Sequence, residues 1–209
     1  LKKGDILSFG GPRNGCRAYV AFGGGIIMPS VLGSRSTNLF SGFGGIKGRS
    51  LQKGDRLSID SPEAKLPIAG RLLKSEWIPQ YPSVWTLRVV WGPQDNDFTS
   101  NGKRTLTHTF YRVSPESDRS GIRLEGAEIR RKRDAAESII SEGLISGSIQ
   151  VPGDGKPIII LGETVSGGYR KIATIIIADL HLLGQIKPGD EIQFEAVSLE
   201  EANDALDEP

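Results

Sequence analysis

Apolar residues gather in short runs that are separated by glycine, proline and aspartate. Residues 84–91 and the alternating residues 105–113 have the pattern of strands, and residues 158–161 and 172–177 are continuous apolar runs of strand length. Alternation is typical of a half-buried strand, and a short apolar run between turn residues is typical of a buried one. The pattern predicts an antiparallel β-barrel or sandwich whose turns display the polar groups.

One turn pattern occurs three times, in residues 1–9, 51–59 and 186–194. Each copy has an apolar residue, a basic turn, Gly-Asp, and then alternating apolar and polar positions. Glycine permits the positive φ of a tight turn, and aspartate can bond its own backbone. We interpret the pattern as a recurring entry into a strand; two related barrels in tandem are the alternative.

The remaining pattern predicts short helices and one boundary. Residues 198–206 carry an S-x-x-E capping box with apolar positions on one face, and residues 134–137 resemble a capping box led by aspartate. Four prolines in residues 60–83 preclude long regular elements there. We therefore predict an all-β chain with a few short helices, divided into residues 1–60, a proline-rich connector at 61–83, and a second domain at 84–209.

Composition excludes several classes of function. Lys+Arg total 26 against Asp+Glu 25, a balance that argues against a nucleic-acid surface. The single cysteine, Cys16, fits a reducing compartment, and no apolar run approaches the roughly 20 residues of a spanning helix, so we expect a cytoplasmic protein. One cysteine and two distant histidines, His108 and His181, predict no metal site. The chain opens on Leu1 without a visible signal peptide, as if cut from something longer.

The glycine-dense residues 15–49 contain two candidate anion sites. Gly23–Gly25 is either a bend or a phosphate-binding loop, and the missing GxxxxGK[ST] spacing favours the bend. Arg35 stands among three hydroxyl residues, which suits a carboxylate or phosphate. A solvated turn is the alternative for this arginine.

The best cluster for chemistry is a set of polar groups beside glycine turns. A glutamine can both donate to and accept from an amide, an arginine can hold a carboxylate at two points, and glycine N–H groups can face a developing oxyanion. Such a set suits a small acid that carries an amide; turn and barrel-closing roles are the alternative. The residues are Gln94, Asp95, Asp118, Arg119, Gln150, Thr164, Ser166, Gly167, Gly168 and Tyr169.

Several separated motifs resemble one protein family. They are G-C-R-A-Y at 15–19, P-S-V-L-G-S-R-S-T at 29–37, G-P-Q-D at 92–95, V-S-P-E-S-D-R at 113–119 and S-G-G-Y-R-K-I at 166–172. Together they resemble the second subunit of allophanate hydrolases. That family includes KipA, the C-subunit of the bacterial ATP-dependent 5-oxoprolinase, and part of the carboxyltransferase region of urea carboxylase.

The resemblance implies a fold, a reaction and partners. It implies tandem cyclophilin-like β-barrels, the first truncated at its N-terminus, and ATP-dependent opening of 5-oxoproline to glutamate. The implied partners are a KipI-like subunit (the B-subunit of 5-oxoprolinase) and a LamB/YcsF-like subunit, with ATP bound somewhere in the complex. The catalytic candidates are Gln94, Asp118, Arg119 and Gln150, and the substrate-binding candidates are Arg17, Arg35, Thr164, Ser166, Gly167, Gly168 and Tyr169.

Two rival functions stay open at this point. One is the carboxyltransferase part of a biotin-dependent carboxylase acting on urea or a similar amide; the chain has no A-M-K-M biotin-carrier segment. The other is a non-enzymatic regulator of the KipA type, which binds a KipI-like inhibitor of a histidine kinase. Both the regulator and the enzyme would use the same partner surface.

Overall fold

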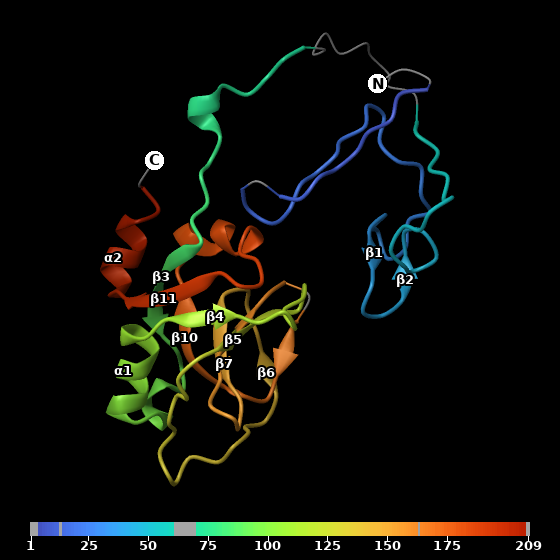
Figure 1. The fold of residues 1–209 in the computed structure, drawn as a ribbon. Coiled ribbons are helices and arrows are strands. Elements are labelled where there is room, and N and C mark those ends of the chain that lie inside the picture. The colour runs from blue at the N-terminus through green and yellow to red at the C-terminus, as the bar shows by residue number, and fades with distance from the viewer. Residues whose placement is uncertain (1–3, 13, 61–69, 163, 208–209) are drawn as a thin grey trace. The chain divides into compact units, whose positions relative to one another are not determined.

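Seven strands of the computed structural model close into a barrel in the order β10-β3-β11-β4-β5-β8-β7. The structure describes residues 4–12, 14–60, 70–162 and 164–207. By their internal contacts they divide into two units, residues 18–78 and residues 1–17 with 79–209, and the barrel lies in the second (Figure 1). Its strands are β3 (Val84–Trp91), β4 (Tyr111–Val113), β5 (Gly121–Glu125), β7 (Ser148–Val151), β8 (Ile158–Ile160), β10 (Arg170–Ile175) and β11 (Glu191–Ala196).

The barrel core is filled by the inward positions of these strands. On β3 the predicted strand is confirmed, with Trp85, Leu87 and Val89 buried and the residues between them more exposed. Ile149 of β7 and Ile159 of β8 lie opposite each other and are fully buried. The predicted antiparallel arrangement is wrong for one pair, because β11 runs parallel to β3. These two strands lie far apart in sequence, so no hairpin requires them to be antiparallel.

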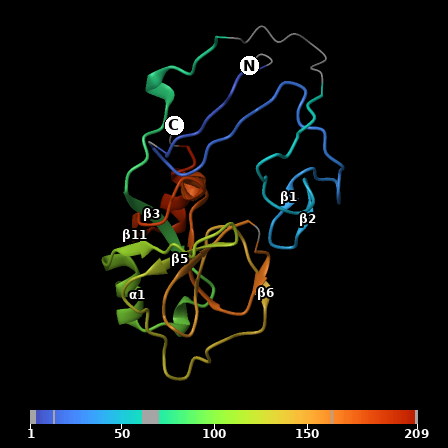
Figure 2. The ribbon, with the colours of Figure 1, turned by 45° about the vertical axis from the view of Figure 1, so that its right-hand side comes forward.

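Helices cover one side of the barrel. The α-helices are α1 (Ser100–His108) and α2 (Leu199–Asp204), and the 3-10 helices of this unit are η2 (Asp95–Asp97) and η3 (Ile177–Gly184). α1 packs on β11 and α2 on β3, whereas the short strand β6 (Glu142–Gly143) lies on the side away from α1 (Figures 1 and 2). Ser198 and Glu201 form the predicted capping box at the start of α2. Within the described ranges no helix is long and apolar enough to cross a bilayer.

The prediction of a strand over residues 105–113 is wrong for most of its length. α1 occupies residues 100–108, and only Tyr111–Val113 form a strand. The Thr99 hydroxyl accepts a bond from the Gly102 N–H at 2.9 Å and caps the helix. Inside the helix Thr105 bonds the Asn101 carbonyl at 2.9 Å. A threonine hydroxyl can satisfy itself on the preceding turn, so the alternation of threonine with other residues did not require a strand.

Two smaller expectations have different outcomes. The candidate helix start at residues 134–137 is wrong, because these residues lie in turns and bends without helix, and the Arg131 guanidinium donates to the Ala136 carbonyl at 3.0 Å. The bend favoured at Gly23–Gly25 is a turn, in which the Gly25 N–H donates to the Phe22 carbonyl at 2.9 Å.

The repeated Gly-Asp pattern folds into the same turn in two of its copies. Asp55 accepts the Gln52 N–H at 2.7 Å, and Asp190 accepts the Lys187 N–H at 3.1 Å. The glycines before them have φ of 94° and 90°, a region that side chains strain to enter. The predicted entry into a strand is therefore confirmed for residues 186–194, where β11 follows the turn, whereas in residues 51–59 the same turn is followed only by an isolated bridge at Ile59. Residues 1–3 of the first copy lie outside the described residues.

The unit of residues 18–78 has little regular structure. It contains β1 (Thr37–Asn38) paired with β2 (Phe43–Gly44), the 3-10 helix η1 (Ser75–Trp77), and isolated bridges such as Ile26 with Ile59. Residues 14–17 pack with the barrel unit, where the Cys16 N–H donates to the Gln185 side-chain oxygen at 2.9 Å. The chain is thus mostly β with few helices, as predicted, while the tandem arrangement and the boundaries at 60 and 83 stay predictions.

Candidate functional site

A layer of buried polar side chains covers the outer face of β7 and β10. Gln150 of β7 lies opposite Lys171 of β10 in the antiparallel register. Their neighbours Ile149 and Val151 are in the core, so the alternation of the strand directs Gln150 away from it. Both polar residues are nevertheless buried, with exposed fractions of 3% and 7%. Burial of an outward glutamine and lysine requires polar partners, and the structure supplies them.

Glu142 is the partner of the lysine. It lies on β6, which pairs with β9 (Ser166–Gly167), and its carboxylate oxygen Oε2 accepts a bond from the Lys171 ammonium. The same oxygen accepts the Gln94 side-chain N–H at 3.1 Å, while the Gln94 side-chain oxygen accepts the Lys171 backbone N–H at 3.1 Å. A cation and an amide donor therefore converge on one carboxylate oxygen. We call Lys171 and Gln94 the carboxylate-binding pair.

The electrostatics of Glu142 match this geometry. Hydrogen bonding from the Lys171 ammonium holds the pKa of the Glu142 carboxyl below its usual value, with a smaller contribution from the Gln94 amide. The Glu142 side chain is 46% exposed, whereas that of Lys171 is 8% exposed. Lys171 is therefore buried on a strand of the barrel, whereas Glu142 lies at the surface.

Two glycines bring the neighbouring turn onto Gln150. A Cβ on Gly167 would stand 2.9 Å from the Gln150 amide nitrogen, and one on Gly168 would stand 3.0 Å from the Ile139 carbonyl oxygen. A side chain at Gly167 would displace the Gln150 amide, and one at Gly168 would crowd a backbone carbonyl. The Gln150 N–H then donates to the Tyr169 carbonyl at 3.0 Å. Gln150, Gly167, Gly168 and Tyr169 are therefore brought together, as the sequence predicted.

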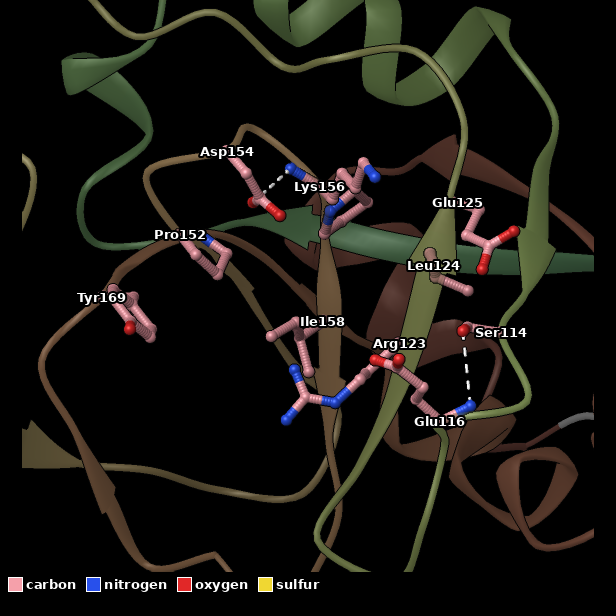
Figure 3. Close-up of a pocket in the computed structure, with 11 residues that line it drawn as sticks. Ser114, Glu116, Arg123, Leu124, Glu125, Pro152, Asp154, Lys156, Ile158 and Tyr169 are labelled. Atoms are coloured by element: carbon pink, nitrogen blue, oxygen red, sulfur yellow. Dashed lines mark hydrogen bonds between the residues drawn. The ribbon is translucent and has the colours of Figure 1, made fainter.

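A pocket of about 420 Å³ lies beside this layer, and Tyr169 is one of its walls (Figure 3). Tyr169 is the only member of the predicted set that lines it, all of that set being among the described residues. The pocket is formed by the β4–β5 and β7–β8 connections and by the outer face of β5 and β8.

Asp118, Arg119 and Thr164 form a second group. Asp118 accepts the N–H groups of Ser120 at 2.8 Å and Gly121 at 3.1 Å, which closes the turn before β5. Arg119 is exposed in that turn. The Thr164 hydroxyl donates to the Ser120 carbonyl at 3.1 Å. Asp118 is thus a turn residue, the alternative that the sequence left open, and its carboxylate is committed to backbone donors.

The loop of residues 164–169 connects the two groups. Thr164 bonds next to the Asp118 turn, and Gly167, three residues later, contacts Gln150. Three residues span at most about 10 Å, so the two groups lie along one loop. Ser166 lies between them on β9 and is exposed.

Arg17 and Arg35 lie elsewhere. The Arg17 guanidinium donates to the carbonyls of Leu183 and Gly184 at the end of η3, so it holds a helix terminus. Arg35 is exposed beside a turn in the unit of residues 18–78, where Ser36 N–H bonds the Ser34 hydroxyl at 3.1 Å. Arg17 is therefore bound to η3, and Arg35 belongs to the other unit.

The two ionic members of the layer, Lys171 and Glu142, are absent from the predicted set. Lys171 follows Arg170 at the start of an apolar strand, and Glu142 stands in a short exposed segment. The lysine at the start of this apolar strand could have been recognised from the sequence as a site candidate. A strand of this kind buries a charged residue only when that residue has a partner. The partner could not be found from spacing, since 29 positions separate the two residues. Among the described residues, no group of three or more His, Cys, Asp or Glu could hold a metal ion.

The chain matches a known family over most of its length. Residues 1–196 match the model of a family described as "Carboxyltransferase domain, subdomain A and B", and the chain belongs to this family. It is 36% identical over 203 residues to the C-subunit of 5-oxoprolinase from Escherichia coli (strain K12), covering 97% of this chain and 63% of that protein. The predicted family resemblance is thus confirmed. The chain spans less than two thirds of the length of that relative.

Proteins named for urea are also similar to the chain. Urea amidolyase of Lachancea kluyveri is 34% identical over 220 residues, covering 97% of this chain and 12% of that protein. The crystal structure of the K. lactis urea amidolyase superposes with a TM-score of 0.83 at 32% identity, over 97% of this chain and 13% of that one. Sequences similar to this chain therefore occur in proteins whose names indicate two different amide substrates.

Proposed function

We propose that the chain is part of a subunit of an ATP-dependent 5-oxoprolinase, which opens 5-oxoproline to glutamate. The observation that carries the proposal is the carboxylate-binding pair of Lys171 and Gln94 beside the buried amide of Gln150. 5-Oxoproline presents these two groups, a carboxylate and a lactam. Similarity to the C-subunit of 5-oxoprolinase over nearly the whole chain supports the same reaction.

Each residue then has a role. The substrate carboxylate takes the place of Glu142 on Lys171 and Gln94, because a half-exposed carboxylate can leave more easily than a buried lysine can. Gln150 lies across from Lys171, and its amide can donate to and accept from the lactam together. Gly167 and Gly168 stay candidates for donating N–H groups to the developing oxyanion.

The reaction consumes ATP and water. The γ-phosphate passes to the lactam oxygen, water attacks the activated carbon, and the ring C–N bond breaks, giving glutamate, ADP and phosphate. We assign no nucleotide contact to this chain. Its residues bind and orient the substrate, and an acid–base group of the complex completes the step.

The proposal includes partners and a setting. A KipI-like subunit closes the site, a LamB/YcsF-like subunit completes the complex, and the assembly is cytoplasmic. Tandem cyclophilin-like domains, with a first domain at residues 1–60 and a second at 84–209, are the domain plan proposed for this subunit.

A carboxyltransferase acting on urea or a similar amide is the second candidate. The structural similarity to urea amidolyase favours it. Urea has no carboxylate, so Lys171 and Gln94 would keep Glu142 during that reaction, and Gln150 alone would read the amide. The transferred carboxyl group of that reaction comes from carboxybiotin, so the two candidates differ in whether the KM for the amide substrate itself depends on Lys171.

The test is glutamate release by the complex of this chain with its partner subunits, supplied with 5-oxoproline and ATP. We expect Lys171→Met to raise the KM for 5-oxoproline at least about tenfold, because a charge-assisted bond to the substrate is lost. Arg104→Gln, on the exposed face of α1, is the matched control and should leave KM unchanged. Arg119→Ala tests the remaining predicted catalytic arginine, and unchanged turnover would remove it from the site.

Two results would reject the proposal. One is transfer of the carboxyl group of carboxybiotin to urea in place of glutamate release, which selects the second candidate. The other is a folded Lys171→Met variant with unchanged KM, which would make the contact of Lys171 with Glu142 a structural ion pair only.

A further inference from the structure

The pocket beside Tyr169 is lined by five charged side chains; the Asp154 carboxylate accepts a backbone N–H, and the other four do not pair with one another. Arg123 and Lys156 supply the positive charges, and Glu116 and Glu125 supply negative ones (Figure 3). Within the described part of the chain, none of these four charged groups makes a hydrogen bond or an ion pair. Unpaired charges of both signs around one hollow can be bridged by a ligand that carries both signs.

Arg123 is held in place by its backbone. Its N–H donates to the Ser117 hydroxyl at 3.0 Å, and its carbonyl accepts the Ser114 N–H at 2.9 Å. Its strand position is also fixed by pairing with Ile158 of β8. The guanidinium extends beside Ile158 into the open space of the pocket (Figure 3). The paired strand therefore fixes the point from which the Arg123 side chain reaches into the pocket.

The opposite wall is rigid as well. Asp154 accepts the Lys156 N–H at 3.1 Å, and the Gly155 N–H donates to the Pro152 carbonyl at 3.1 Å, which closes the β7–β8 turn. The Asp154 carboxylate is thereby used in the turn, while the Lys156 ammonium stays available. Ile158 forms a half-buried apolar floor between the two cations, and Tyr169 stands at the side.

We propose that this pocket binds an acidic α-amino acid. Its two carboxylates pair with Arg123 and Lys156, its ammonium pairs with Glu116 or Glu125, and its methylene carbons lie on Ile158. A simple anion would meet two uncompensated glutamates, and a simple cation would meet an arginine and a lysine. The volume of about 420 Å³ lies within the range of small-molecule sites.

The pocket lies outside the carboxylate-binding pair, and its charges alone carry the inference. A failure of the proposed function would therefore leave this inference unaffected, and a failure of this inference would leave the proposed function unaffected. Under that function L-glutamate is the product, and the pocket would then place a product-sensing site against Tyr169, whose carbonyl Gln150 contacts.

Binding to the full chain, without ATP or partners, is the test. L-Glutamate, glutarate and 5-oxoproline are titrated separately by calorimetry; glutarate lacks the ammonium, and 5-oxoproline lacks both the ammonium and the second carboxylate. We expect saturable binding of L-glutamate, at least about tenfold weaker binding of the other two, and a loss of about tenfold or more in Arg123→Gln. The double variant Glu116→Gln/Glu125→Gln should bind L-glutamate only as tightly as the unchanged chain binds glutarate.

Two controls locate the ligand. Arg104→Gln should bind as the unchanged chain does, and Lys171→Met should retain binding of L-glutamate. Circular dichroism checks that each variant is folded. Three results would each overturn the assignment. They are the absence of saturable binding, equal affinity for glutarate and L-glutamate, and loss of L-glutamate binding in Lys171→Met with retention in Arg123→Gln.

Discussion

The barrel and the unit of residues 18–78 use the same residue types with different results. In the barrel, apolar positions such as Phe194 and Ile149 are buried on strands that have neighbours on both sides. In residues 18–78 the strands are two residues long, and Leu32 and Phe40 are 91% and 86% exposed. Apolar residues therefore form a core in the barrel, because its closed sheet gives them a common interior.

The repeated Gly-Asp turn allows a sharper comparison, because it occurs in both regions. Asp190 of the barrel accepts the Lys187 N–H and also the indole N–H of Trp85 at 2.9 Å, a buried bond. Asp55 accepts the Gln52 N–H and pairs with the Arg49 guanidinium at 2.8 and 2.9 Å. Both regions share the local turn. The stability that the aspartate contributes depends on whether its second partner is in the core or at the surface.

The largest expected difference is in the cost of truncating a phenylalanine. Phe194→Ala should lower the free energy of unfolding by about 3–5 kcal/mol, since it opens a cavity in the barrel. Phe40→Ala should change it by no more than about 0.5 kcal/mol, since the side chain is exposed. Urea unfolding followed by tryptophan fluorescence measures both. Equal losses would contradict the contrast between a packed barrel interior and an exposed surface.

The second largest expected difference is in the cost of removing the aspartate of the shared turn in each region. Asp190→Ala should cost about 3 kcal/mol, because the buried indole N–H of Trp85 and the Lys187 N–H lose their acceptor. Asp55→Ala should cost clearly less, because its arginine partner can turn to water. The same unfolding assay compares them. A larger loss for Asp55→Ala would show that the turn, and not the core contact, dominates.

A smaller effect is expected in the pH dependence of stability. The folded-state pKa of Glu142 is lowered, so its contribution is fully present above the unfolded-state pKa of about 4.3 and is lost as pH falls through the folded-state pKa. The free energy of unfolding, measured from about pH 6 to about pH 3, should therefore fall less steeply in Glu142→Gln than in the unchanged chain. Parallel curves would mean that the bond from Lys171 does not favour the ionised carboxylate in solution.

The sequence predicted more of the barrel than of the site. Strand β3, the C-terminal capping box and the Gly-Asp turns followed from local patterns, because each depends on residues close together in the chain. The strand expected at residues 105–113 failed because threonine hydroxyls can satisfy themselves within a helix. The parallel pairing of β3 with β11 has no local signature.

The site divides in the same way. Gln150, Gly167, Gly168 and Tyr169 were predicted together and do lie together, since the glycines mark a close approach visible in the sequence. A substrate-binding role of Arg17 stays a prediction, and its contact with the end of η3 could not be predicted, because an arginine that holds a helix end has no distinguishing sequence pattern. Glu142 was missed because its contact with Lys171 depends on how β6 folds over β10, which no spacing reveals.

The central claim is that Lys171 and Gln94 hold a carboxylate for which Glu142 is a substitute from the chain itself. The direct test is the KM for 5-oxoproline of the complex that contains Glu142→Gln. If the claim is right, KM falls severalfold with kcat little changed, because the neutral amide competes less well for the Lys171 ammonium. An unchanged or higher KM in a folded variant would contradict it, and would leave Glu142 as a structural partner of the lysine.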